Sequence, residues 1–173
     1  VEGYRNFATK LWNAARFCLM NQGRPQAGYD PSANRLTLNR WIVGELAKTQ
    51  RDLLAALEAY RLNDAANLLY HFTWHSFCDW YIEFAKPLLE SEDAAVLAET
   101  RGTIGWVMNA LLRLLHPIMP FITEELWSQF GDASAEQLLH APLPALDPAL
   151  SDAGAAGEID WLIRLVSEVR AVR

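Results

Sequence analysis

The chain has 173 residues, of which 51% are hydrophobic, 11% aromatic and seven tryptophan, with a formal net charge of −6. This apolar content is enough for one packed domain and excludes a collagen-like or wholly disordered chain. No apolar run reaches the roughly 18 residues of a membrane span, no signal peptide is evident, and two cysteines favour a reducing compartment, so we expect a cytoplasmic protein.

The hydrophobic periodicity is helical along nearly the whole chain, and no segment alternates as a strand does. It predicts long helices over residues 4–21, 38–60, 63–90 and 91–115. Thr37 and Asn63 are residue types that cap helix starts, and Pro87 should bend or begin to end the third helix. Because the connections are short, we expect an all-α antiparallel helix bundle.

The last third of the sequence is less regular. A turn between Pro117 and Pro120 should precede a short helix that starts after Thr123 and is closed by Gly131. Glu124 and Glu125 suit the positive end of that helix. Residues 133–157 are rich in Ala, Pro, Asp and Gly and predict a surface loop, and a last helix should cover 159–172.

Charge is unevenly distributed, with net values of +4 over residues 1–44, −12 over 45–160 and +2 over 161–173. The basic ends can form a local anion-binding surface, or they can be ordinary surface scatter. In the first predicted helix, one face is apolar and the other holds cations and amides, without any carboxylate: Arg5, Asn6, Thr9, Lys10, Asn13, Arg16 and Asn21.

Phe17 and Met20 fall within this polar face. Cationic groups bind phosphate, amides bind base edges and a solvent-facing ring stacks on a base, so the face suits unpaired RNA. The alternative is a solvated helix face with Phe17 packed under a neighbouring helix or loop.

The other polar clusters do not form an active site. His71, His75 and Cys78 have helical spacing, but they lack the glutamate of a zinc-protease helix, so core or groove histidines are favoured over zinc ligands. Asp79 and Glu83 lack a nucleophile nearby, which favours a salt bridge to an arginine on another helix. His116 and His140 stand alone. Five tryptophans spread across the predicted helices should anchor the core: Trp41, Trp74, Trp106, Trp127 and Trp161.

Four segments carry a resemblance to a known family: RNFATKLWNAARF (5–17), NRWIVGEL (39–46), FCDWYIEFAKPLL (77–89) and LHPIMPFITEELW (115–127). Together they resemble the anticodon-binding helical domain of class I valyl-tRNA synthetases. The isoleucyl and leucyl enzymes share the fold and the pattern of Pro-x-x-Pro followed by Glu-Glu-x-Trp. The resemblance covers about residues 3–147 and 159–173 and implies a domain that binds the anticodon loop of tRNA(Val).

The resemblance also implies which residues contact the tRNA. Lys10, Asn13, Arg16 and Phe17 match the family motif that faces the anticodon loop, and Arg5 is added for its position on the same helix. Lys10 and Arg16 would hold phosphate or base edges, Asn13 would bond a base and Phe17 would stack on one. Thr9 departs from the asparagine expected before the lysine.

The class I ATP-binding signatures are absent from the sequence, so the resemblance implies a monomeric module of a longer ligase. We expect neither catalytic nor metal-binding residues here, with ATP used by the catalytic domain of the same polypeptide. We divide the chain into a bundle (1–147), a flexible linker (148–158) and a helix leading to a further tRNA stem-contacting region (159–173). An isoleucyl or leucyl enzyme and a helical protein-interaction module without RNA binding are the alternatives.

Overall fold

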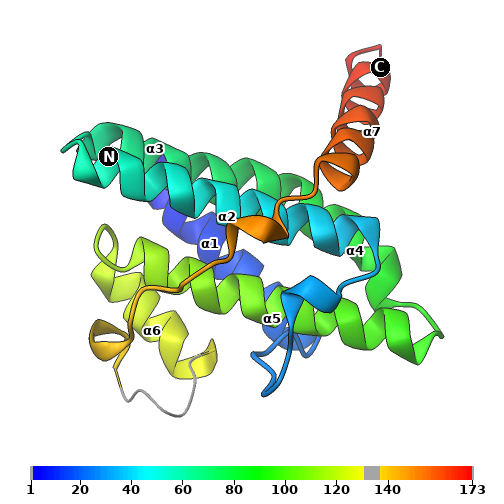
Figure 1. Ribbon diagram of the computed structural model, residues 1–173, viewed down its shortest axis with the longest axis horizontal. Helices are drawn as coiled ribbons and strands as arrows, with labels where there is room; N and C mark the ends of the chain where they lie inside the picture. The colour runs from blue at the N-terminus through cyan, green and yellow to red at the C-terminus, as the bar shows by residue number, and fades with distance from the viewer. Residues whose placement is uncertain (1, 131–136, 173) are drawn as a thin grey trace.

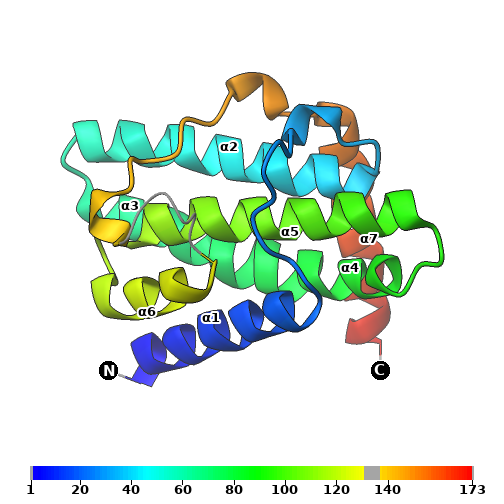
Figure 2. The ribbon, with the colours of Figure 1, turned by 90° about the horizontal axis from the view of Figure 1, so that it is seen from below.

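Successive long helices run in opposite directions across the molecule (Figures 1 and 2). The computed structural model describes residues 2–130 and 137–172, apart from the side chains of Glu2 and Tyr4. The helices that it describes are α1 (Glu2–Met20), α2 (Thr37–Glu58), α3 (Leu62–His71), α4 (Ile82–Leu89), α5 (Ala94–Leu115), α6 (Pro120–Phe130) and α7 (Ala153–Ala171). No described residue lies in a strand, which confirms the predicted all-α antiparallel bundle.

The core lies between α1, α2, α5 and the long helix that begins with α3. Side chains three or four residues apart on each helix supply it, as the helical periodicity predicts. Its largest fully buried members include Leu11, Ile42, Leu46, Phe77, Tyr81, Ile104, Met108 and Leu111. Among the described helices, none combines the length and the hydropathy that crossing a membrane requires.

The third predicted helix is one continuous helix with an irregular middle. α3 passes directly into the π-helical segment η2 (Phe72–Tyr81) and then into α4, which ends two residues after Pro87. Asn63 lies inside α3, where Arg61 is the residue at the cap position, so the predicted asparagine cap is wrong. A π-helix bonds residue i to i+5, and such segments occur often at functional sites.

The start of α2 is fixed by a residue of α5. Thr37 is the first residue of the helix, and the preceding Leu36 has no side-chain cap, so the predicted Thr37 cap is wrong. Instead, the Glu99 carboxylate accepts the backbone N–H groups of Arg35 (3.1 Å) and Leu36 (3.0 Å). A carboxylate 63 residues from Leu36 in sequence therefore holds the backbone that leads into the helix.

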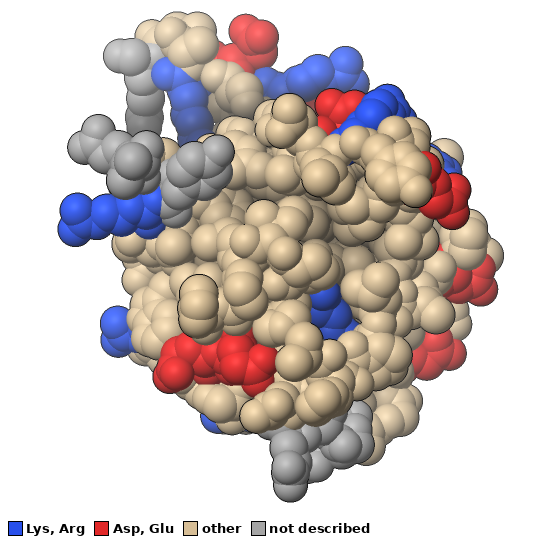
Figure 3. All heavy atoms as spheres, turned by 90° about the vertical axis from the view of Figure 1, so that its left-hand side faces the viewer, with Lys and Arg blue, Asp and Glu red and all other residues tan. Residues whose placement is uncertain are grey.

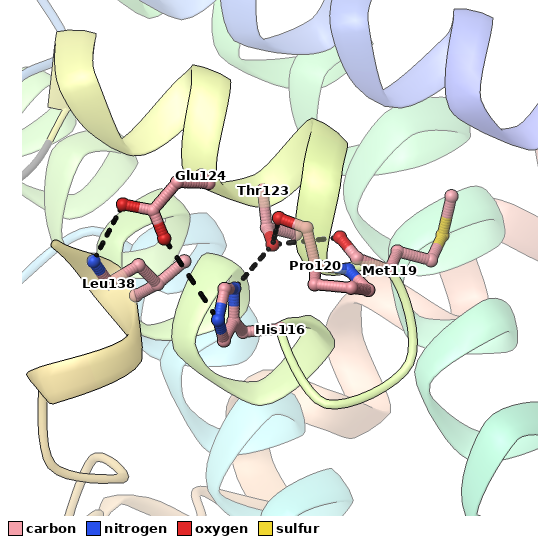
Figure 4. A network of polar contacts seen from close by, with 6 residues as sticks. All are labelled: His116, Met119, Pro120, Thr123, Glu124 and Leu138. Atoms are coloured by element: carbon pink, nitrogen blue, oxygen red, sulfur yellow. Dashed lines mark hydrogen bonds and ion pairs between the residues drawn. The ribbon is translucent and has the colours of Figure 1, made fainter.

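The corner between α5 and α6 contains a polar network (Figure 4). His116 Nδ1 lies 2.9 Å from the hydroxyl of Thr123, which donates to the carbonyl oxygen of Met119 (2.8 Å). Because α6 begins at Pro120, Thr123 is inside the helix, and the prediction that the helix starts after Thr123 is wrong. Glu124 accepts the Leu138 N–H (2.9 Å) and lies 4.0 Å from His116 Nε2. His116 is therefore not isolated, and Glu124 holds a neighbouring turn rather than only facing a helix end.

The described part of the predicted loop lies first against α6, at Leu138, and then against α2 from Pro144 onward. The side-chain oxygen of Gln50 accepts the Leu146 N–H (3.1 Å), and its amide donates to the Pro144 carbonyl. A Cβ built on Gly44 would lie 2.9 Å from the Leu150 carbonyl oxygen, which shows how closely the two segments approach. The chain forms the short turns η3 (Leu138–His140) and η4 (Pro148–Leu150) on the way. Gly131, the predicted end of the short helix, lies outside the described residues.

The last helix begins six residues earlier than predicted, at Ala153, so half of the predicted linker 148–158 is helical. Asp152 caps it by accepting the Ala155 N–H (2.9 Å) and pairs with Arg40 of α2 (3.2 Å). Beyond its buried first turns, α7 projects from the bundle (Figure 1). Trp161 is 59% exposed, so the prediction that it anchors the core is wrong.

The thiols of Cys18, which is buried, and Cys78, which is partly buried, predict a loss of stability in alkali. Burial raises the pKa of Cys18 above its ordinary value of 9.0, and it raises the pKa of Cys78 to about 12 despite nearby Lys10. Because the folded state favours the neutral thiols, their stabilisation is complete below pH 9 and is lost as the pH rises toward 12. We expect the free energy of unfolding, measured in urea, to fall above pH 9 by about 1.4 kcal/mol per pH unit for each thiol. Cys78→Ala should make this decline shallower, and an unchanged decline would contradict the assignment.

Candidate nucleic-acid interface

The face of α1 that points away from the core is polar and accessible. Phe7, Leu11 and Cys18 are buried on its inner side. The side chains exposed on its outer side are Arg5, Asn6, Thr9, Asn13, Arg16 and Met20. α1 lies at one edge of the bundle, so its outer face is not covered by another described helix (Figure 2). The division of α1 into two faces that the sequence predicted is therefore confirmed.

Three of the predicted tRNA-contacting residues have free donors. The side chains of Arg5, Asn13 and Arg16 are exposed, and none has a hydrogen-bond or ion-pair partner among the side chains that the structure describes. Thr9, in contrast, donates its hydroxyl to the Arg5 carbonyl one turn earlier (3.0 Å). Guanidinium and amide groups without internal partners can donate hydrogen bonds to phosphate and base edges without first breaking a bond.

Phe17 is less exposed than a solvent-facing ring would be. It is half-buried and packs against the hydrophobic core, which agrees in part with the alternative of a packed Phe17. Its backbone carbonyl accepts the side-chain amide of Asn21 (2.9 Å) at the end of α1. Packing fixes the ring in place, while part of its surface remains accessible. Along the helix, Phe17 comes about one turn after Asn13 and directly after Arg16.

Lys10 differs from the other cations of α1 because it has internal partners. Its ammonium pairs with Asp79 Oδ1 of η2 and lies 3.8 Å from the ring centroid of Trp74. The second oxygen of Asp79 lies 3.2 Å from His75 Nδ1. The predicted salt bridge of Asp79 to another helix is thus present, with a lysine in place of the expected arginine, whereas Glu83 pairs with Lys86 on its own helix (2.7 Å).

An aromatic stack supports this ion pair. Phe7, Tyr70 and Trp74 all contact one another, with ring centroids 5.3 Å (Phe7–Tyr70), 5.6 Å (Tyr70–Trp74) and 6.5 Å (Phe7–Trp74) apart. His71 and His75 stack on each other at 5.4 Å, and both are exposed, so they are surface residues rather than core histidines. The sequence showed the aromatic character of this segment, but not that it packs beside Lys10, because residues 70–79 and α1 are distant in sequence.

The described residues offer no evident cation site. Nowhere in the part of the chain that the structure describes do three His, Cys, Asp or Glu side chains come close enough to hold a metal ion. Cys78, which the sequence placed beside the two histidines, is free and partly buried. The polar side chains next to α1 are suited to hydrogen bonding, and the aromatic ones are suited to stacking.

A separate apolar groove of about 830 Å³ lies at the end of the bundle where α1 and α3 begin and α5 ends. Phe7, Leu69, Leu115 and Met119 are among its lining residues, and Phe121 at its edge is 91% exposed. Figure 3 shows this end of the molecule, where most of the surface is uncharged and the charged side chains lie mainly toward the edges. Such a surface suits protein contact better than phosphate binding.

Comparison with known proteins agrees with these features. Residues 39–173 match the family described as "Anticodon-binding domain of tRNA ligase". The whole chain is 50% identical to the valine–tRNA ligase of Caulobacter vibrioides and 49% identical to that of Ruegeria pomeroyi, of which it covers 19% and 17%. It is also 48% identical to the valine–tRNA ligase of Rhizobium meliloti, covering 18% of it. The chain thus spans about a fifth of the length of these relatives, and it belongs to the family of anticodon-binding domains of tRNA ligases.

Proposed function

We propose that this chain binds the anticodon loop of tRNA(Val) and does so as one module of a valine–tRNA ligase. The single observation that carries the proposal is the exposed polar face of α1 in a chain that belongs to the anticodon-binding family. The relatives of highest identity named above are all valine–tRNA ligases, which supports valine over isoleucine or leucine as the amino acid of the full enzyme.

Each residue of the face has a chemical role in this proposal. Arg5 and Arg16 bind backbone phosphates with exposed guanidinium groups, which pair with none of the side chains that the structure describes. Asn13 bonds a base edge, because an amide both donates and accepts. Phe17 stacks on an unpaired base with the accessible part of its ring, and Lys10 donates from the position where Asp79 and Trp74 hold it.

The catalytic step belongs to the rest of the proposed ligase, which uses ATP to activate valine and esterify it to the tRNA. The role of this module is to bind the anticodon loop and so position the tRNA, whose acceptor end lies far from that loop. The apolar groove around Phe121 is then available for packing against another part of the longer polypeptide.

Replacing Phe17 tests the stacking role. We expect Phe17→Leu, which keeps an apolar side chain in the partly buried site but removes the ring, to weaken binding of a valine anticodon stem-loop by about 1–3 kcal/mol. The measurement is a fluorescence titration at low salt, with isoleucine and methionine stem-loops for comparison. Thermal unfolding of each variant checks that the bundle remains folded.

Phe121→Ala is the matched control, because it removes an exposed aromatic ring from a different end of the bundle. It should leave stem-loop affinity unchanged. Equal losses in both variants, or no binding of any stem-loop by the wild-type chain at low salt, would overturn the proposed function of this face.

A further inference from the structure

One carboxylate lies beside the otherwise cationic face of α1, at the point where the face meets η2. One oxygen of Asp79 accepts the Lys10 ammonium and the other lies 3.2 Å from His75 Nδ1, so each oxygen has a polar neighbour. A carboxylate next to an RNA-binding lysine weakens general attraction to phosphate, since it cancels the charge that would provide it. Its presence there requires another explanation.

The geometry holds the Lys10 ammonium in a defined place. Asp79 takes one of its three N–H donors, and the Trp74 ring lies 3.8 Å away on another side. Trp74 is itself fixed by stacking on Tyr70, which stacks on Phe7 of α1. The lysine side chain would otherwise sample many rotamers, and restricting it before binding removes part of the entropy cost of each contact that it makes.

From this arrangement we propose that Asp79 is a positioning residue that fixes Lys10 for base recognition and suppresses its use as a general phosphate contact. An ammonium that is held in place and paired with a carboxylate still donates hydrogen bonds, which depend on direction. Because the carboxylate cancels its charge at a distance, it contributes little to the long-range attraction of RNA. Asp79 therefore favours the correct anticodon loop by lowering affinity for incorrect ones. This inference rests on the proposed function of α1.

The test compares discrimination between stem-loops rather than affinity alone. Asp79→Asn keeps the side-chain size but removes the charge, and we expect the ratio of valine to isoleucine stem-loop affinity to fall about three- to tenfold, the value of one well-placed hydrogen bond. Non-cognate stem-loops should bind more tightly. Asp79→Glu, which retains the charge on a longer side chain, should restore part of the ratio.

Glu83→Gln is the matched control. It also removes one carboxylate that pairs with a lysine, but that lysine is Lys86 on the same helix. Because the change in net charge is identical, Glu83→Gln should leave the affinity ratio unchanged. An equal fall in both variants would show that only net charge matters and would overturn the proposal.

A second background separates positioning from a purely structural role. If Asp79 acts through Lys10, Asp79→Asn should have no further effect on the ratio in a Lys10→Ala chain. A persistent effect in that background would overturn the proposal, because a structural role of Asp79 does not need the lysine.

The contact can also be tested without RNA. The chain has three lysines, Lys10, Lys48 and Lys86, so acylation by a small amine reagent can be followed at each one by mass spectrometry. Asp79→Asn should increase acylation of Lys10 relative to exposed Lys48 several-fold, and an unchanged ratio would overturn the positioning of Lys10. Increased acylation together with no stem-loop binding by wild type would instead reject the proposed function and, with it, the RNA role of Asp79.

Discussion

Gly105→Ala is expected to destabilise the protein by about 2–3 kcal/mol, as overpacking of a tightly filled site typically does. Gly105 lies in the middle of α5, where the segment after α1 crosses the helix (Figure 2). A Cβ at this position would lie 2.1 Å from the Arg24 carbonyl oxygen and 2.2 Å from its carbon. These are backbone atoms, so no side-chain rotation relieves the overlap and the crossing segment has to move.

The control for this substitution is Gly157→Ala in α7. Nothing lies within 4 Å of a Cβ at Gly157, so alanine should stabilise the protein by about 0.5–1 kcal/mol through its higher helix propensity. Urea unfolding of both variants measures the difference. If Gly105→Ala were as stable as Gly157→Ala, the close crossing over α5 would be wrong.

Asn39→Leu is expected to cost about 3 kcal/mol, because it removes two buried hydrogen bonds, one to Tyr81 and one to Glu99. Asn39 is fully buried on α2 and accepts the Tyr81 hydroxyl at 2.9 Å. Its amide donates to Glu99 at 3.0 Å, the same carboxylate that holds the start of α2. Leucine has nearly the same shape but provides neither bond, so the buried Tyr81 hydroxyl would lose its Asn39 acceptor and Glu99 would lose the amide donor.

Removing the second partner should recover part of this loss. The double variant Asn39→Leu with Tyr81→Phe no longer has the buried hydroxyl. Its loss in free energy of unfolding should therefore be smaller than the sum of the losses in the two single variants. Urea denaturation of the two single variants and the double variant gives this coupling. Simple additivity would mean that the Asn39–Tyr81 bond contributes nothing beyond packing.

Local pattern was sufficient for the type of most elements, but not for their ends. The apolar residues of α1 and α2 repeat with the helical period, and both helices were predicted within a few residues. The sequence placed the starts of α2 and α6 one and four residues too late, since the helices begin at Thr37 and Pro120. Before α2 the backbone is held by Glu99 of α5, and a contact with a residue so distant in the chain leaves no local signal.

The candidate interface shows the same division. Arg5, Asn13 and Arg16 are exposed on the face where the helical wheel placed them, since the angle between residues on one helix follows from helix geometry. The helical wheel places Lys10 on the same polar face. In the fold, however, η2 packs beside it, so that Lys10 pairs with Asp79 and lies over the Trp74 ring. A wheel describes one helix alone and contains no information about what packs at the edges of its faces.

The sequence by itself determined the fold class, the family, and the two faces of α1, because periodicity and motif depend on residues that are near one another in the chain. Only the tertiary structure decided that Phe17 is half-buried, that Lys10 is held by Asp79, and that residues 144–152 lie against α2. Those features depend on contacts between segments far apart in sequence. Their free energies come from packing and from hydrogen bonds that exist only once the helices have assembled.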